Sequence, residues 1–172
     1  MRHVISVLMQ NEVGALTRLT GMFSTRGYNI ESLNVAPTDD PTLSRLTVVS
    51  SGSDAVIAQI VNQMGKLIDV VNIHDMTLGE HFERELLLLK LKVPTGAYEE
   101  LRGLVDSAGA RVLDDSQTSF TLELTATVKQ VQEFMDRAAG IARIIAVVRS
   151  GALAMSRGEH VLAHETGLRD SA

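Results

Sequence analysis

The feature that most constrains the fold is an order of segments, strand–helix–strand–strand–helix–strand, that occurs twice along the chain. The first copy opens with the apolar run at residues 3–9. The second opens with an alternating run at residues 86–93, where every second residue is apolar and shares one face. A unit of this order folds as a four-stranded antiparallel sheet with both helices on one face, the ferredoxin-like arrangement. We therefore predict an α+β protein made of two such βαββαβ domains.

The first predicted domain extends over residues 1–76. Asn11 is a typical N-cap residue and Gly27 a typical C-cap residue, so they bracket a first helix. Residues 29–36 and 44–50 alternate on either side of a turn and predict a hairpin-like pair. A second helix begins near Asp54, and a strand at residues 70–76 completes the unit. The apolar face of the first helix is expected to consist of Val13, Leu16, Leu19 and Phe23.

The second predicted domain extends over residues 86–158. Gly109 is expected to end its first helix, while Thr127 caps its second helix and Gly140 ends it. Residues 77–85 are polar and poorly patterned, so we predict a linker there, and residues 159–172 form a C-terminal tail. Each domain has about 75 residues, a size at which one core is marginal. The uncovered sheet face and edges are therefore expected to need partners.

The amino-acid composition excludes several classes of function for this chain. The net charge is −5 and the chain has no Trp and only two Tyr, so it lacks the basic stripe and stacking aromatics that nucleic acid needs. There is no cysteine, which excludes disulfides, thiolate metal sites and a cysteine nucleophile. No apolar run approaches the roughly 20 residues of a membrane span. We expect a cytoplasmic protein that binds neither nucleic acid nor membrane.

The sequence contains no recognisable catalytic set. The pairs at 39–40 and 114–115 are aspartates beside predicted turns, where aspartate is favoured for local hydrogen bonding. His160 and His164 have helical spacing, but the HExxH order of a zinc peptidase is absent, and a solvated tail explains them. No Ser/His/Asp set, P-loop or GxGxxG occurs. We predict no catalytic residue, metal or cofactor for this chain, and a binding function for it.

The most informative local feature is Gly14, which is expected in the first turn of the first helix. First-turn N–H groups and the positive end of the helix dipole can hold a carboxylate, and a glycine leaves its approach open. The alternative is an ordinary capped helix with a packing glycine. Asn29 offers both a donor and an acceptor to a zwitterion, although it can equally be a turn asparagine that bonds its own backbone.

Two sets of residues carry a family resemblance. The run NEVGALTR at residues 11–18, on a βαββαβ unit, resembles an ACT domain, a module that binds amino acids between paired domains. The longer runs RGYNIESLNVAPTDDPTLSRLT at 26–47 and RSGALAMSRG at 149–158 resemble the small-subunit family of acetolactate synthase, also called acetohydroxyacid synthase. The resemblance covers residues 1 to about 160.

This resemblance implies a non-catalytic regulatory subunit that activates a separate thiamine-diphosphate-dependent large subunit and confers feedback inhibition by valine. Leucine or isoleucine could replace valine as the effector. Thiamine diphosphate, Mg²⁺ and FAD would belong to the catalytic partner. The alternative is a free-standing amino-acid sensor that controls another enzyme or transcription. The family places valine at the interface of a homodimer of first domains, against Asn11, Gly14, Ala15, Leu16, Asn29 and Ile30.

Overall fold

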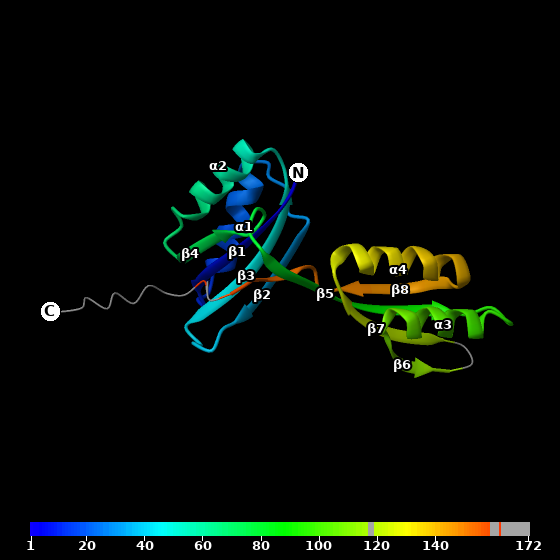
Figure 1. The fold of residues 1–172 in the computed structure, drawn as a ribbon. Helices are drawn as coiled ribbons and strands as arrows, with labels where there is room; N and C mark the ends of the chain where they lie inside the picture. The colour runs from blue at the N-terminus through cyan, green and yellow to red at the C-terminus, as the bar shows by residue number, and fades with distance from the viewer. Residues whose placement is uncertain (117–118, 159–161, 163–172) are drawn as a thin grey trace. The chain divides into compact units, whose positions relative to one another are not determined.

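The computed structural model describes residues 1–116, 119–158 and 162, and its chain divides into two units. The first unit is Met1–Phe82 together with the chain from Ala154 onward, and the second is Glu83–Leu153. Each unit has a pair of helices and one antiparallel sheet, which can be followed in Figure 1. The predicted βαββαβ order is present in both, so the α+β fold class is confirmed.

The first unit has an antiparallel sheet in the order β2-β3-β1-β4. Its central strand β1 pairs with β3 along one edge and with β4 along the other. Both faces of β1 are buried along almost its whole length. The elements are β1 (Arg2–Gln10), α1 (Ala15–Thr25), β2 (Ser32–Pro37), β3 (Leu43–Ser51), α2 (Asp54–Met64) and β4 (Val70–Asp75).

Helices α1 and α2 pack against one face of this sheet. Alternate residues of β1 and β3 point to the helices, because successive side chains of a strand point to opposite faces. The core between helices and sheet is mainly aliphatic: Ile5, Val7, Met9, Ala15, Leu19, Phe23, Leu46, Val48, Ile57, Ile60 and Met64.

The opposite face of the first sheet is covered by the end of the chain. Strand β9 (Leu153–Ser156) brings the Ala154 N–H to the Thr47 hydroxyl at 3.4 Å, and the Arg45 guanidinium donates to the Leu162 carbonyl at 2.7 Å. Val4, Leu8 and Val49 on this face are buried. The expectation that this face lacks a cover is therefore wrong, because the chain returns to the first unit after the second is complete.

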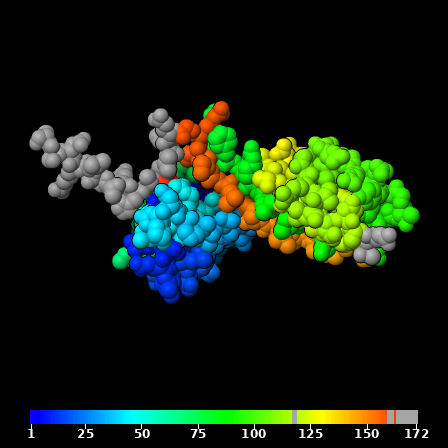
Figure 2. All heavy atoms as spheres, turned by 90° about the horizontal axis from the view of Figure 1, so that it is seen from below, coloured from blue at the N-terminus to red at the C-terminus, as the bar shows by residue number. Residues whose placement is uncertain are grey.

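The second unit repeats the arrangement with the strand order β6-β7-β5-β8, and β9 pairs with β5. Its core is aliphatic with two phenylalanines, Phe120 and Phe134, and lies between the sheet and two helices. The space-filling view shows one face of this unit, coloured from green to orange (Figure 2). The elements are β5 (His81–Lys92), α3 (Tyr98–Ala108), β6 (Arg111–Asp115), β7 (Phe120–Ala126), α4 (Val128–Ile141) and β8 (Arg143–Arg149).

The segment predicted as a linker at 77–85 is partly strand. β5 begins at His81, and Glu85 is buried within it. The carboxylate of Glu85 accepts two hydrogen bonds from the Arg149 guanidinium, at 2.6 and 2.9 Å. A buried carboxylate with such a partner does not follow the apolar alternation by which strands are recognised, so the sequence pattern missed this part of β5.

The cap predicted at Thr127 and the stop predicted at Gly109 agree with the structure. The helix ends predicted at Asn11, Gly27, Asp54 and Gly140 differ by one to three residues. Gly109 ends α3 in a left-handed conformation, as predicted. The N-cap of α2 is Ser53, whose hydroxyl accepts from the Val56 N–H, and it takes the place expected for Asp54. α4 continues through Gly140 to Ile141. Among the described residues, no helix is long and apolar enough to span a membrane.

Candidate functional site

The entrance to α1 is built around Gly14. This residue is the N-cap and has φ 88° and ψ −14°, a left-handed conformation that residues with a Cβ adopt at a cost. A Cβ at this position would also stand 2.9 Å from Nη1 of Arg18. Gly14 therefore lies one step before the first turn, and its backbone geometry requires a glycine.

The prediction that Asn11 caps α1 is wrong. The Asn11 N–H donates to the Thr42 carbonyl at 2.7 Å, and its side-chain amide donates to the Pro41 carbonyl at 3.0 Å. Asn11 therefore joins the end of β1 to the turn before β3. No side chain caps α1, and its first turn contains no acidic residue. The positive end of this helix is thus not compensated by a carboxylate of its own first turn.

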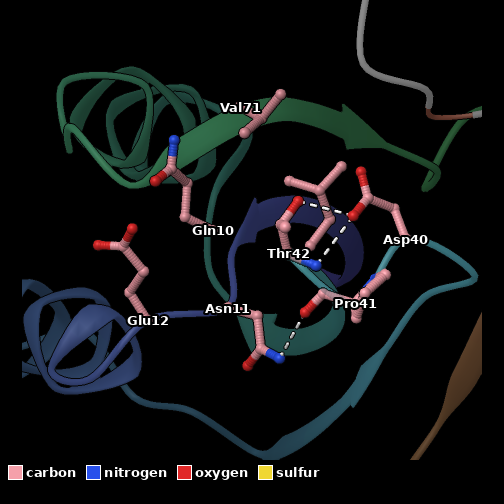
Figure 3. Close-up of a pocket in the computed structure, with 8 residues that line it drawn as sticks. Gln10, Asn11, Glu12, Asp40, Pro41, Thr42 and Val71 are labelled. Carbon is pink, nitrogen blue, oxygen red and sulfur yellow. Dashed lines mark hydrogen bonds between the residues drawn. The ribbon is translucent and has the colours of Figure 1, made fainter.

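A hollow of about 630 Å³ lies beside this entrance (Figure 3). The loop after β1, the turn before β3 and one residue of β4 line it, and the turn is held by Asp40, whose carboxylate accepts from the Thr42 N–H and hydroxyl at 2.9 and 2.7 Å. Two of the residues at this hollow, Glu12 and Asp40, are acidic. The lining residues are Gln10, Asn11, Glu12, Asp40, Pro41, Thr42, Leu43 and Val71.

An ion pair holds α1 against the same edge of the sheet. Nε and Nη2 of Arg18 donate to the two carboxylate oxygens of buried Asp69 at 2.6 and 2.7 Å, while the Asp69 carbonyl accepts from the Gln10 N–H at 2.8 Å. Hydrogen bonding to Arg18 holds the pKa of Asp69 below its usual range, and the same bond raises the pKa of Arg18. The sequence analysis did not predict this ion pair. Its only signal in the sequence is the carboxylate of Asp69, which stands between the apolar residues Ile68 and Val70 where β4 begins.

The other predicted residues of this segment differ in exposure. Ala15 is buried in the core, and its N–H donates to the Glu12 carbonyl at 3.2 Å, so its contribution to a surface site is limited. Leu16 is 37% exposed and stands in the first turn. Val13 is fully exposed, which corrects its expected place on the apolar helix face, since the helix begins only at Ala15.

One chain does not bring Asn29 and Ile30 to this entrance. The Asn29 carbonyl accepts from the Ser50 hydroxyl at 2.7 Å, and Ile30 packs against the helix-side core. Ser50 pairs with the start of β1, whereas Asn11 follows the end of β1. A strand rises about 3.4 Å per residue, so the two groups lie roughly 25–30 Å apart along β3.

The remaining candidates show no chemistry beyond local structure. Asp115 accepts from the Tyr98 hydroxyl, which raises the pKa of Tyr98, and Asp114 accepts from the Ser119 hydroxyl at 3.1 Å. Within residues 1–116, 119–158 and 162, no group of three or more His, Asp or Glu side chains could hold a metal ion. His160 and His164 lie outside the described residues.

The comparisons with known proteins agree over most of the chain. Residues 5–72 match the family described as AHAS small subunit-like ACT domain, and residues 84–158 match the family described as small subunit of acetolactate synthase. The chain is 41% identical over 162 residues to the acetolactate synthase isozyme 3 small subunit of Salmonella typhimurium, covering 94% of this chain and 99% of that protein. It is 39% identical over 160 residues to a probable acetolactate synthase small subunit of Archaeoglobus fulgidus, covering 92% and 98%.

A solved structure shows the same fold. The crystal structure of the acetolactate synthase small subunit from Thermotoga maritima superimposes with a TM-score of 0.83 at 28% identity, covering 93% of this chain and 99% of that one.

Proposed function

Because this chain belongs to the family of acetolactate synthase small subunits, we propose that it binds a catalytic large subunit, raises its activity and makes it sensitive to valine. The role of a regulatory subunit follows from that membership. In this proposal the chain performs no reaction step, and thiamine diphosphate, Mg²⁺ and FAD belong to the catalytic subunit. The observation that supports an effector site here is that no side chain caps the N-terminus of α1, which lies beside the hollow lined by Glu12 and Asp40.

The chemistry of this entrance suits an amino acid. The carboxylate of the ligand would lie at the N-terminus of α1, where N–H groups and the helix dipole favour an anion. Its ammonium group would point toward the hollow, where Glu12 and Asp40 provide negative charge. The exposed part of Leu16 offers apolar surface to a branched side chain, which favours valine, leucine or isoleucine over a polar effector.

The positions of Asn29 and Ile30 favour a site made by two copies of the first unit. Within one chain they stand at the opposite end of β3 from Asn11, so a single ligand could touch both groups only if a second copy supplied one of them. A homodimer in which the entrance of α1 faces the partner's Asn29 and Ile30 would satisfy this requirement. The proposed effector residues are Asn11, Gly14, Ala15, Leu16, Asn29 and Ile30.

Valine would then act by coupling between sites, because the proposed site lies on a different chain from the catalytic chemistry. To inhibit the complex, valine must stabilise its inhibited arrangement relative to the active one by about 1–3 kcal/mol. This corresponds to a shift of roughly 5–150-fold in the equilibrium between the two arrangements.

The decisive experiment measures acetolactate formation by the large subunit, with and without this chain, across valine concentrations. We expect stimulation without valine and loss of that stimulation as valine rises. A large subunit whose rate is the same with and without the chain would contradict the proposal and would favour a free-standing sensor.

A further inference from the structure

The guanidinium of Arg18 uses only two of its three nitrogens in the ion pair with Asp69. Nε and Nη2 donate to the Asp69 carboxylate at 2.6 and 2.7 Å, and Nη1 takes no part in these two bonds. An arginine carries its N–H donors in a planar fork, so the two on Nη1 are left over from this pair. The Arg18 side chain is 48% exposed, whereas that of Asp69 is 5% exposed. The ion pair therefore has a buried side, which is Asp69, and an accessible side, which belongs to the guanidinium.

The nitrogen left over from the ion pair is directed at Gly14. A Cβ on Gly14 would lie 2.9 Å from Nη1 of Arg18, 3.6 Å from its Cζ and 3.8 Å from its Nη2. The cause is the direction of helical side chains, which lean toward the N-terminus of their helix. Arg18 stands one turn into α1, where its N–H donates to the Gly14 carbonyl at 2.9 Å, so its side chain folds back over the first turn. A glycine at position 14 leaves the space beside Nη1 that any side chain there would fill.

Asp69 fixes where this guanidinium stands. The Asp69 carboxylate is buried, and the Asp69 carbonyl accepts from the Gln10 N–H at 2.8 Å. Gln10 lines the hollow beside α1, so the ion pair is tied to the wall of that hollow. Two parallel bonds to one carboxylate also fix the plane of the guanidinium. The accessible edge of Arg18 is therefore positioned before any ligand arrives, which lowers the entropic cost of binding one.

The charges at this place suit a zwitterion. The hydrogen bond to Asp69 raises the pKa of Arg18, and the charges of Asp69 and Glu12 raise it further, so the guanidinium stays charged. Glu12 stands on the loop that leads from β1 into α1 and lines the hollow (Figure 3). A ligand with a carboxylate for Arg18 and an ammonium group for Glu12 would pair both charges at once.

We propose that Nη1 of Arg18 binds the carboxylate of the amino-acid effector, beside the first-turn N–H groups of α1. The edge of a guanidinium matches the two oxygens of a carboxylate, and charge-assisted hydrogen bonds of this kind are stronger than neutral ones. This inference rests on the function proposed above, because it takes the same site and the same class of ligand. Asp69 touches no ligand in this arrangement and is a positioning residue. The two members of the ion pair therefore have different roles, which a purely structural ion pair would not have.

The test measures preference for a carboxylate. Calorimetry of full-length chains compares valine with valinamide, which keeps the side chain and the ammonium group but replaces the carboxylate by a neutral carboxamide. We expect the parent chain to bind valine at least about tenfold more tightly than valinamide.

Two variants that both lack the ion pair should differ in this preference. Asp69→Asn keeps a hydrogen-bond acceptor for the guanidinium, so the preference should stay within about twofold of the parent's. The double variant Arg18→Gln with Asp69→Asn leaves no buried unpaired charge, and its preference should fall below about threefold. Arg26→Gln, at the exposed C-cap of the same helix, is the matched control and should change both dissociation constants less than about twofold.

The outcomes separate the inference from the function on which it rests. If the double variant keeps the parent's preference for valine over valinamide, Arg18 only clamps Asp69 and the inference is wrong. The inference is equally wrong if Asp69→Asn and the double variant lose the preference to the same extent. A parent chain that binds neither ligand overturns the proposed effector site instead. Thermal unfolding of each variant verifies that the first unit is folded.

Discussion

Gly14 is the residue on which both the geometry and the proposed chemistry of the α1 entrance depend. Its left-handed conformation predicts that Gly14→Ala lowers the free energy of unfolding by about 1–2 kcal/mol. Gly14→Asp should carry the same strain and add a carboxylate where the ligand's carboxylate would lie, so valine binding should be abolished. Urea unfolding and calorimetry with valine measure the two effects separately.

Gly21 is the control for this prediction, because it lies inside α1 with no atom within 4 Å of a built Cβ. Gly21→Ala should stabilise the chain by roughly 0.5–1 kcal/mol. If Gly14→Asp binds valine as tightly as the parent chain, the effector site is placed wrongly.

Asp69 predicts a specific dependence of stability on pH. Arg18 lowers the pKa of Asp69 in the folded state below the value of about 3.9 for an unfolded chain. The stabilisation is therefore fully present above that unfolded value and is lost as the pH falls through the folded pKa. Asp69→Asn should lower stability at pH 7, and the difference from the parent chain should shrink as the pH falls below about 4.

Urea unfolding between pH 3 and 7 measures this difference, with Asp39→Asn in the exposed turn before β3 as the control. A difference between Asp69→Asn and the parent that stays constant over this range would argue against the ion pair as its source.

At the scale of elements, α1 and α4 show how differently two helices of similar length can begin. α4 starts with a capping box: the Thr127 hydroxyl accepts from the Gln130 N–H, and the Gln130 side chain accepts from the Thr127 N–H. Thr127→Ala should therefore destabilise the second unit by about 1 kcal/mol, measured by thermal or urea unfolding. Thr125→Ala, at an exposed position of β7, is the control and should cost less than half of that. Equal losses for both would show that the cap contributes nothing.

For the whole molecule, the end of the chain is part of the first unit. Ala154 is 8% exposed on the sheet face, whereas its neighbour Met155 is 66% exposed. Ala154→Asp would bury an unpaired charge and should destabilise the first unit by roughly 2–4 kcal/mol, while Met155→Asp should have little effect. Denaturant unfolding of the full chain compares the two, and equal stabilities would mean that β9 does not cover the sheet.

The same cover bears on how the effector signal travels. A chain truncated near Thr77 keeps every residue of the proposed effector site, so it should still dimerise, but it lacks the second unit and the cover of Val4, Leu8 and Val49. We expect its effect on acetolactate formation to respond weakly or not at all to valine, compared with the full chain on the same catalytic subunit. An unchanged inhibition curve would show that residues beyond Thr77 have no part in transmission.

The sequence by itself determined the features that depend on neighbouring residues. The two βαββαβ units could be predicted because their signals are local. These signals are the alternation in residues 86–93, the helical spacing around Leu19 and Phe23, the cap at Thr127 and the stop at Gly109.

Only the tertiary structure decided the features that join distant parts of the chain. Arg18 and Asp69 are 51 residues apart, Glu85 and Arg149 are 64, and Thr47 and Ala154 are 107. No periodicity relates such positions, because each pair forms only after the intervening elements have packed. Asn29 follows α1 by only a few residues, yet it lies at the far end of β3 from Asn11. The direction in which α1 runs sets the distance between these two residues.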